Sequence, residues 1–307
     1  MIKLRKLAIV KKIEEASNRI VLPGFQGVPL GTVMRFFFKS LSKGIIFHRA
    51  AAMTYRIFFS IIPMFMALFA ALSFFGERAQ AIILNFIESV VPEYVWPAIS
   101  EMITEVMRKQ NGTVFYFSLV IGTFFLFISV NACINILNTT YFADTRRSFF
   151  RQLPIVFLII IVWLTIIVLA IGVFIGASAT FSYIDSHIFK SQHLLQTCLF
   201  IFKWLLLFFL VYMFISSFYY LAPAKIREYK LFSAGSTFAT ISMVLILGIM
   251  NFYFANFGNY NLIYGSLGAL FAIQLWLYWN AMFILIGYDL NVSIAAAKKS
   301  HNNSLNS

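Results

Sequence analysis

The residues from Leu231 to Tyr288 form a stretch of 58 positions without Asp, Glu, Lys, Arg or His. One helix needs about 20 apolar residues to cross a bilayer, so this stretch is long enough for two crossings and a turn. Residues 256–261, with the sequence Asn-Phe-Gly-Asn-Tyr-Asn, are typical of such a turn. The sequence therefore predicts a transmembrane helical hairpin with an uncharged polar tip, whose second helix leaves the bilayer at Asp289.

The composition extends this prediction to the whole chain. Hydrophobic residues make up 61% of the 307 positions and charged residues 11%, whereas soluble domains have about 25% charged residues. The expected spans are 51–75, 114–137, 153–181, 198–221, 231–254 and 264–288. These stretches lack the alternation of polar and apolar residues that a membrane barrel needs. The predicted fold class is an all-α integral membrane protein with six transmembrane helices plus N-terminal and outer-face amphipathic helices.

The distribution of Lys and Arg predicts the orientation of these spans. With the N-terminus inside, eighteen of these residues fall in inner segments and four in outer segments, while Arg56 and Lys203 lie within helices. We therefore expect both termini in the cytoplasm. The net charge of +13 follows this pattern, so we expect anionic phospholipid headgroups at the cytoplasmic face as partners, and no nucleic acid.

Segments outside the spans complete the expected organisation. The predicted units are 1–47, cytoplasmic basic amphipathic helices; 48–292, the six-helix transmembrane domain; and 293–307, a disordered cytoplasmic tail. Within the first unit, residues 1–19 and 33–47 suit interfacial helices. Within the second, the outer segment 76–111 is expected to form two short amphipathic helices separated by Pro92 and Pro97.

Polar side chains inside the spans are the candidates for a functional site. The candidate residues are Arg49, Arg56, Ser60, Asn131, Asn135, Asn138, Asn251, Asn256, Asn280 and Asp289. Ionisable residues within a bilayer are costly and usually have partners. We therefore expect Arg56 and Asp289 to lie at similar depth and to form an ion pair or part of a polar site. The alternative is that Arg56 is an anchor at the inner interface.

Helical spacing places several candidates on common faces. The stripe on the first span carries Arg49, Met53, Arg56, Ser60 and Pro63. Proline removes a backbone hydrogen bond, so Pro63 predicts a kink. The face on the second span carries Asn131, Asn135 and Asn138. Each face could line a cavity or pack against neighbouring helices, and the spacing leaves both interpretations open.

Signals of enzymatic chemistry are weak. The four histidines are scattered, and Cys133 and Cys198 fall in or beside apolar stretches. Metal-binding motifs, phosphate-binding loops and the spacing of a catalytic triad are missing. A two-metal hydrolase needs several clustered ligands, whereas Asp289 is the one acidic residue at the spans. We expect no catalytic residue, metal or cofactor.

Several short segments together point to a family. They are 48–55 (HRAAAMTY), 60–63 (SIIP), 221–223 (LAP), 253–269 (YFANFGNYNLIYGSLGA), 276–278 (WLY) and 285–291 (LIGYDLN). Over residues 47–292 the chain resembles the YihY/BrkB family of membrane proteins, with mild departures at Arg56 and Asp289. The resemblance implies a six-span protein of the bacterial inner membrane. It also implies that the older family label "ribonuclease BN" is a misassignment.

The sequence is compatible with two functions. The leading one is a transporter-like protein that acts on a lipid or other amphiphile in envelope homeostasis, with the polar faces of the first, second and sixth spans lining its path. The alternative is a non-transporting envelope scaffold whose polar residues only hold helices together. A cavity lined by these residues favours transport, whereas mutually satisfied polar groups favour the scaffold. An enzyme is least supported.

Overall fold

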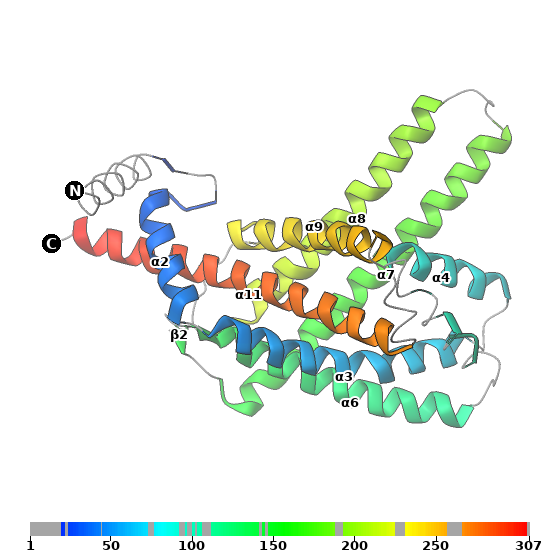
Figure 1. The fold of residues 1–307 in the computed structure, drawn as a ribbon, viewed down its shortest axis with the longest axis horizontal. Helices are drawn as coiled ribbons and strands as arrows, with labels where there is room; N and C mark the ends of the chain where they lie inside the picture. Colours follow the sequence, from blue (N-terminus) through cyan, green and yellow to red (C-terminus); the bar gives the residue numbers. More distant parts are fainter. Residues whose placement is uncertain are drawn as a thin grey trace.

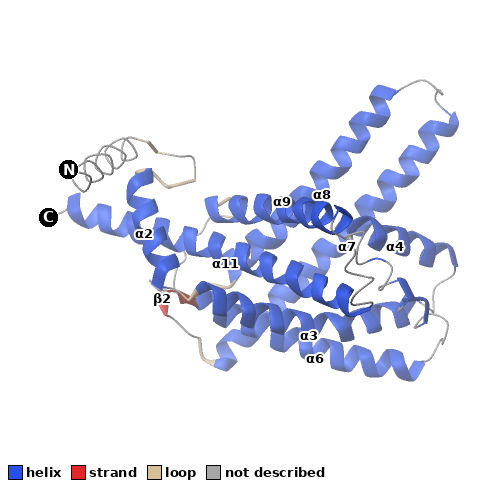
Figure 2. Ribbon diagram, in the orientation of Figure 1, coloured by secondary structure: helices blue, strands red, loops and turns tan. Residues whose placement is uncertain are grey.

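Long helices make up nearly all of the fold. In the computed structural model, the described residues are 20–21, 24–43, 45–72, 77–91, 96, 100–101, 103–105, 112–140, 143–144, 147–187, 193–224, 231–256 and 266–305. The helices are α2 (Leu30–Lys43), α3 (Ile46–Leu72), α4 (Glu77–Val90), α6 (Gly112–Asn138), α7 (Phe149–His187), α8 (His193–Leu221), α9 (Ala234–Asn256) and α11 (Ser266–Leu305). A short antiparallel pairing joins β1 (Thr139–Thr140) to β2 (Ala143–Asp144) (Figure 2).

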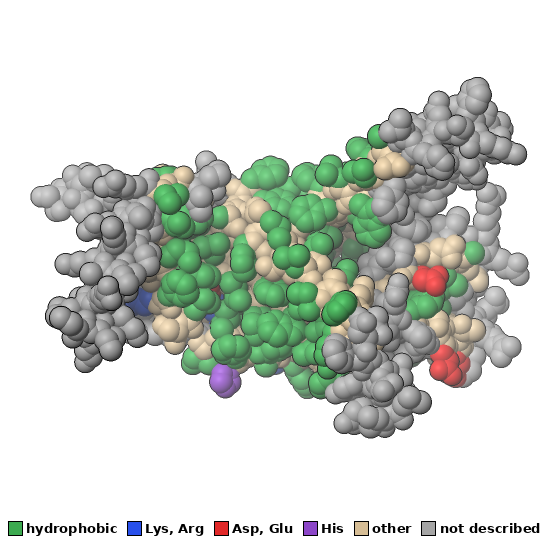
Figure 3. Space-filling view, turned by 45° about the horizontal axis from the view of Figure 1, so that its top comes forward, with side chains coloured by type: hydrophobic (Ala, Val, Ile, Leu, Met, Phe, Trp, Pro, Cys, Tyr) green, Lys and Arg blue, Asp and Glu red, His purple; other side chains and the backbone are tan. Residues whose placement is uncertain are grey.

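Six of these helices are long and apolar enough to cross a membrane, namely α3, α6, α7, α8, α9 and α11. The predicted fold class, an all-α integral membrane protein, is thus confirmed. Large apolar side chains are exposed around the middle of the bundle, and Val168 of α7 is 67% exposed. Figure 3 shows this apolar belt between the two ends. Such a surface suits lipid chains, since a soluble monomer rarely exposes a continuous apolar patch of that extent.

Helix α11 lies at the centre of the bundle (Figure 1). It packs against α9 on one side and α3 on the other, and α2 crosses the part of α11 nearer its C-terminal end. Helix α6 packs along α3, and α7 pairs with α8. The C-terminal end of α7 and the N-terminal end of α8 project beyond the other helices, at the end of the molecule opposite α2.

The C-terminal segment differs from its prediction. Residues 293–307 were expected to be disordered, but α11 continues to Leu305. The cause is an apolar cluster in which Leu290, Ile294 and Ala297 of α11 pack with Val28 and Val33. The helix expected over residues 33–47 is α2, and its Val33 face is buried in this cluster. The helix expected over residues 1–19 lies outside the described residues.

The outer segment is described in part. Helix α4 corresponds to the first predicted amphipathic helix, and its Ile87 packs with Phe69 of α3 and with Ile103. Residues 96, 100–101 and 103–105 of the second predicted helix are helical. The two prolines predicted to separate the helices, and residues 257–261 of the predicted hairpin tip, lie outside the described residues.

Candidate functional site

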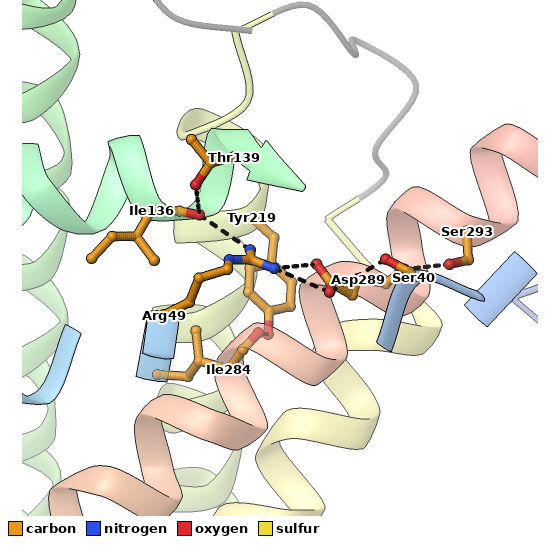
Figure 4. A network of polar contacts seen from close by, with 8 residues as sticks. All are labelled: Ser40, Arg49, Ile136, Thr139, Tyr219, Ile284, Asp289 and Ser293. Carbon is orange, nitrogen blue, oxygen red and sulfur yellow. Dashed lines mark hydrogen bonds and ion pairs between the residues drawn. The ribbon is translucent and has the colours of Figure 1, made fainter. Parts of the chain in front are cut away.

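A buried ion pair joins α3 to α11 (Figure 4). Arg49 Nη1 donates to both carboxylate oxygens of Asp289, at 3.3 and 3.2 Å. Arg49 Nη2 donates to the carbonyl of Ile136 on α6 at 3.1 Å, and Ser40 Oγ on α2 donates to Asp289 Oδ2 at 3.4 Å. The side chain of Asp289 is 0% exposed and that of Arg49 10%. One network therefore connects α2, α3, α6 and α11.

The network stabilises the two buried charges by pairing them and by further hydrogen bonds to both side chains. A buried charge is stabilised by a counter-charge and by hydrogen bonds to its other donors or acceptors. Each Asp289 oxygen accepts at least one hydrogen bond. Arg49 Nε is buried and has no partner among the described residues. Asp289 was expected where the last span leaves the bilayer. In the structure, α11 continues beyond it to Leu305, and Ser40 of α2 hydrogen-bonds to the carboxylate.

The predicted pairing of Arg56 with Asp289 is wrong. Asp289 pairs with Arg49, while Arg56 is exposed and its carbonyl accepts a hydrogen bond from Ser129 of α6. Arg49 and Arg56 are seven residues apart, which is about 10 Å along a helix. The level at which α11 passes α3 therefore decides which of the two cations meets the carboxylate, and spacing within α3 alone could not.

A second polar feature lies between α6 and α7. It is a pocket of about 370 Å³ lined by Asn131, Asn135, Ile136, Thr139, Arg147, Phe149 and Gln152. Gln152 Nε2 donates to Asn131 Oδ1 at 2.6 Å and to Asn135 Oδ1 at 3.1 Å. Gln152 Oε1 is buried and has no partner among the described residues. We refer to this cavity as the α6–α7 pocket.

The α6–α7 pocket adjoins the ion-pair network. Thr139 Oγ1 donates to the Ile136 carbonyl at 3.0 Å, and the same carbonyl accepts the hydrogen bond from Arg49. Figure 4 shows both donors meeting at this carbonyl. Both Ile136 and Thr139 line the pocket. A change at the pocket wall can therefore reach Arg49 through a single carbonyl.

Arg147 supplies the positive charge of the pocket. It donates to the carbonyl of Ala222 at 3.1 Å and to the carbonyl of Pro223. Partial burial lowers the pKa of the Arg147 guanidinium from its ordinary range, yet an arginine keeps its charge in proteins. None of the described residues that line the pocket is acidic. The arrangement can bind an anion or a polar group rich in acceptors.

Asn138 has a structural role beside the pocket. Its Nδ2 donates to the Ala222 carbonyl at 2.9 Å, and its Oδ1 accepts from the Ala224 amide at 2.9 Å. Asn138 is buried. Together with Arg147 it holds residues 222–224, which follow α8, against the end of α6.

The start of α9 packs tightly against α11. Asn291 Oδ1 accepts from the Gly235 amide at 2.8 Å, and its Nδ2 donates to Ser233 Oγ at 2.9 Å. A Cβ atom added at Gly235 would overlap the Gly287 carbonyl oxygen. Glycine at both positions therefore permits the backbones of the two helices to approach each other.

The other predicted residues do not join either feature. Ser60 and Asn280 donate to carbonyls of their own helices, at 2.8 and 2.6 Å. Asn251 Oδ1 is buried without a partner among the described residues. The side chain of Asn256 lies outside the described residues. Helix α3 runs without interruption through Pro63, so the predicted kink stays a prediction.

Sequence reasoning missed Gln152 and Ser40 and treated Arg147 only as a topological charge. Gln152 had a usable signal, since it directly precedes the third apolar stretch and is uncharged. Ser40 had none, because it becomes a site residue only where α2 crosses α11. Within the part of the chain that the structure describes, no three His, Cys, Asp or Glu side chains come together as a metal site would need.

Comparison with known proteins gives consistent matches. The family model described as "Virulence factor BrkB" matches residues 37–306. The chain is similar to the ribonuclease-like protein YfkH of Bacillus subtilis, with 25% identity covering 86% of this chain and 96% of YfkH. It is also similar to the UPF0761 membrane protein NTHI0384 of Haemophilus influenzae, with 28% identity covering 83% of this chain and 91% of the relative. No solved structure matches.

Proposed function

The chain belongs to the virulence factor BrkB family of multi-pass membrane proteins, and we propose that it is a transporter-like member that acts on a lipid or other amphiphile. The observation that carries the proposal is the α6–α7 pocket. It combines two asparagines, a glutamine and an arginine in a cavity of about 370 Å³. This volume lies within the range of ligand sites. Five of its lining residues lie within the spanning segments, namely Asn131, Asn135, Ile136, Phe149 and Gln152.

The surroundings of the pocket support an amphiphile over a water-soluble solute. Phe149 lines the pocket and is 57% exposed, and the neighbouring surface of α7 carries exposed Phe150 and Phe157. A lipid could place its headgroup among the polar side chains and its acyl chains along this apolar surface. We propose the bacterial inner membrane as the location, with both termini in the cytoplasm, because Lys and Arg favour that side.

An enzymatic function is not part of the proposal. One relative is named ribonuclease-like, and that name describes the relative. The polar groups of the described pocket lining are three amides, one hydroxyl and an arginine. They can bind and orient a ligand, but they lack the clustered acid, base or metal ligands that hydrolysis of a phosphodiester uses.

A flux assay tests the proposal. The purified full-length protein is reconstituted into liposomes that contain a headgroup-labelled fluorescent phospholipid, and bleaching by a membrane-impermeant reductant reports movement between leaflets. We expect faster movement than in protein-free liposomes, and slower movement with Asn135→Leu. Arg151→Gln serves as control, since Arg151 is exposed and does not line the pocket. Movement equal to that in protein-free liposomes would contradict the proposal.

One set of contacts favours a non-transporting scaffold as the second candidate. Three buried polar side chains form hydrogen bonds or ion pairs with other helices or loops of the same chain, namely Asp289, Asn138 and Asn291. This is the arrangement expected of polar groups that hold a bundle together. A scaffold would show no lipid movement, and its Asn135→Leu variant would differ from wild type only in stability.

A further inference from the structure

Among the described residues that line the α6–α7 pocket, Arg147 carries the one formal charge, and that charge is positive. Arg147 lines the pocket, and it forms no ion pair among the side chains that the structure describes. Its guanidinium donates to two backbone carbonyls, which orient the group but do not neutralise it. A guanidinium has five N–H donors and matches the oxygens of a phosphate or carboxylate well. The charge of the pocket therefore selects a ligand with an anionic group.

The amide side chains add donors of defined orientation. Gln152 Nε2 donates to the Oδ1 atoms of Asn131 and Asn135, so these oxygens are already occupied. The Nδ2 groups of both asparagines make no hydrogen bond to described residues and are not among the buried unpartnered atoms. Two amide donors without a partner among the described residues thus belong to side chains that, like Arg147, line the pocket. Such a set of donors suits the unesterified oxygens of a phosphate.

Gln152, which lines the pocket, also carries an acceptor that has no partner among the described residues. Gln152 is 2% exposed, and its Oε1 is buried without a hydrogen bond among the described residues. A buried acceptor left unsatisfied is unfavourable, and a ligand that offers it a donor binds more tightly than one that does not. The ligand should therefore carry an N–H or O–H group a short distance from its anionic group.

Resting on the proposed amphiphile-handling function, we infer that the α6–α7 pocket binds a phosphodiester headgroup that carries its own hydrogen-bond donor, as in ethanolamine or glycerol phospholipids. The phosphate lies against Arg147 and the asparagine amides, and the ammonium or hydroxyl donates to Gln152 Oε1. A choline headgroup has the same phosphate but no N–H or O–H, and it leaves Gln152 unsatisfied. The volume of about 370 Å³ equals about twelve water molecules of about 30 Å³ each, which accommodates such a headgroup.

Binding measured separately from transport tests this inference. The delipidated full-length protein is titrated in detergent with ethanolamine, glycerol and choline phospholipids of identical acyl chains, and bound lipid is counted by native mass spectrometry. We expect the first two to bind about tenfold more tightly than the choline lipid, because only they satisfy Gln152. Equal affinity for all three lipids in the wild-type protein overturns the inference without the need for any variant.

Variants assign the preference to the named residues. Gln152→Met should lower the affinities for ethanolamine and glycerol lipids to that for the choline lipid. Arg147→Gln should weaken all three by about tenfold, and Arg147→Lys should restore part of the loss. Arg151→Gln removes an exposed cation four residues further along the chain and should change none of the affinities. Equal losses for Arg147→Gln and Arg151→Gln would indicate general attraction to the basic face, and would overturn the assigned site.

Two further arms identify the source of the headgroup and separate this inference from the proposed function. Soluble glycerophosphoethanolamine that displaces the ethanolamine lipid at equal concentration would overturn a membrane source, whereas failure to displace it supports one. Selective binding without lipid movement in liposomes overturns the transport proposal and leaves the headgroup site intact. Lipid movement without headgroup selectivity overturns the site and leaves the transport proposal intact.

Discussion

Two buried polar residues show how this protein stabilises charge inside an apolar bundle. Arg49 and Asp289 come from α3 and α11, and their pair is completed by the Ser40 hydroxyl and the Ile136 carbonyl. The serine and the carbonyl matter because ion pairing alone rarely offsets the cost of removing two charges from water. The pair is therefore a property of four elements, and its energetics can be tested by changing one partner at a time.

Asp289→Asn should destabilise the protein by about 3–5 kcal/mol, because Arg49 would remain buried without a counter-charge. Arg49→Met should have a similar effect, because the Asp289 carboxylate would remain buried without a counter-charge. The double variant should lose less than the sum of the two single variants, since neither charge remains. Thermal unfolding in detergent, followed by tryptophan fluorescence, measures all three. Additive losses in the double variant would contradict the direct pairing.

Asn138→Ala should destabilise the protein by about 1–3 kcal/mol, because the Ala222 carbonyl and the Ala224 amide would lose a buried partner. Thr165→Ala is a suitable control, as Thr165 is exposed and bonds only to a carbonyl of its own helix. The same unfolding assay compares the two. A shift for Asn138→Ala no larger than that for Thr165→Ala would contradict the proposed clamp on residues 222–224.

At the scale of elements, backbone contact between α9 and α11 sets the packing near the start of α9. Gly235 and Gly287 lie where the two helices approach, and Asn291 hydrogen-bonds to the first turn of α9. Small residues let helices approach closely in membranes, where packing and not the hydrophobic effect drives association. This contact places α11 at the depth at which Asp289 meets Arg49.

Gly235→Ala should destabilise the protein by about 1–3 kcal/mol or more, because the added Cβ overlaps the Gly287 carbonyl and forces the helices apart. Gly248→Ala provides a matched control in the same helix, since a Cβ there meets nothing within 4 Å. Unfolding midpoints of the two variants in detergent give the comparison. Equal midpoints would show that α9 and α11 are not in backbone contact.

Deletion of residues 294–307 should lower the unfolding midpoint, because Ile294 and Ala297 of α11 pack against Val33 of α2. Deletion of residues 300–307 alone should have a much smaller effect, since it leaves this cluster and the bond from Lys298 to Gln26 intact. Had the segment been a disordered tail, the two deletions would behave alike. That result would contradict the extended α11.

At the scale of the whole molecule, charge and apolar surface divide the protein into two ends and a belt. Helix α4 lies at one end and α2 at the other, with the exposed apolar side chains between them. The bias of Lys and Arg predicts that the end with α2 faces the cytoplasm. The α6–α7 pocket lies near that end, where β1 follows α6.

Cysteine labelling in cells tests this orientation. In a Cys198→Ala background that keeps the buried Cys133, Glu88→Cys on α4 should react with a membrane-impermeant maleimide added from outside. Ser300→Cys near the end of α11 should react only after the membrane is permeabilised. Both positions are exposed in the structure, so lack of reaction reflects topology. The reverse pattern would contradict the predicted orientation.

The sequence by itself determined the class of the protein and the number of its spans. Spans are predictable because each must supply about 20 apolar residues and satisfy its own backbone hydrogen bonds, and both requirements are local. The stretch without charge from Leu231 to Tyr288 became α9 and most of the spanning part of α11 for this reason. Helical spacing likewise indicated that Asn131 and Asn135 share a face.

Only the tertiary structure decided which polar groups meet. The spacing within α3 could not choose between Arg49 and Arg56, because the choice depends on the level at which α11 crosses. Ser40 joined the site through the packing of α2, and Gln152 through the contact between α6 and α7. Partners of buried polar groups come from elements distant in the chain, so local sequence patterns do not specify them. The helices follow from local chemistry, whereas the site follows from how they pack.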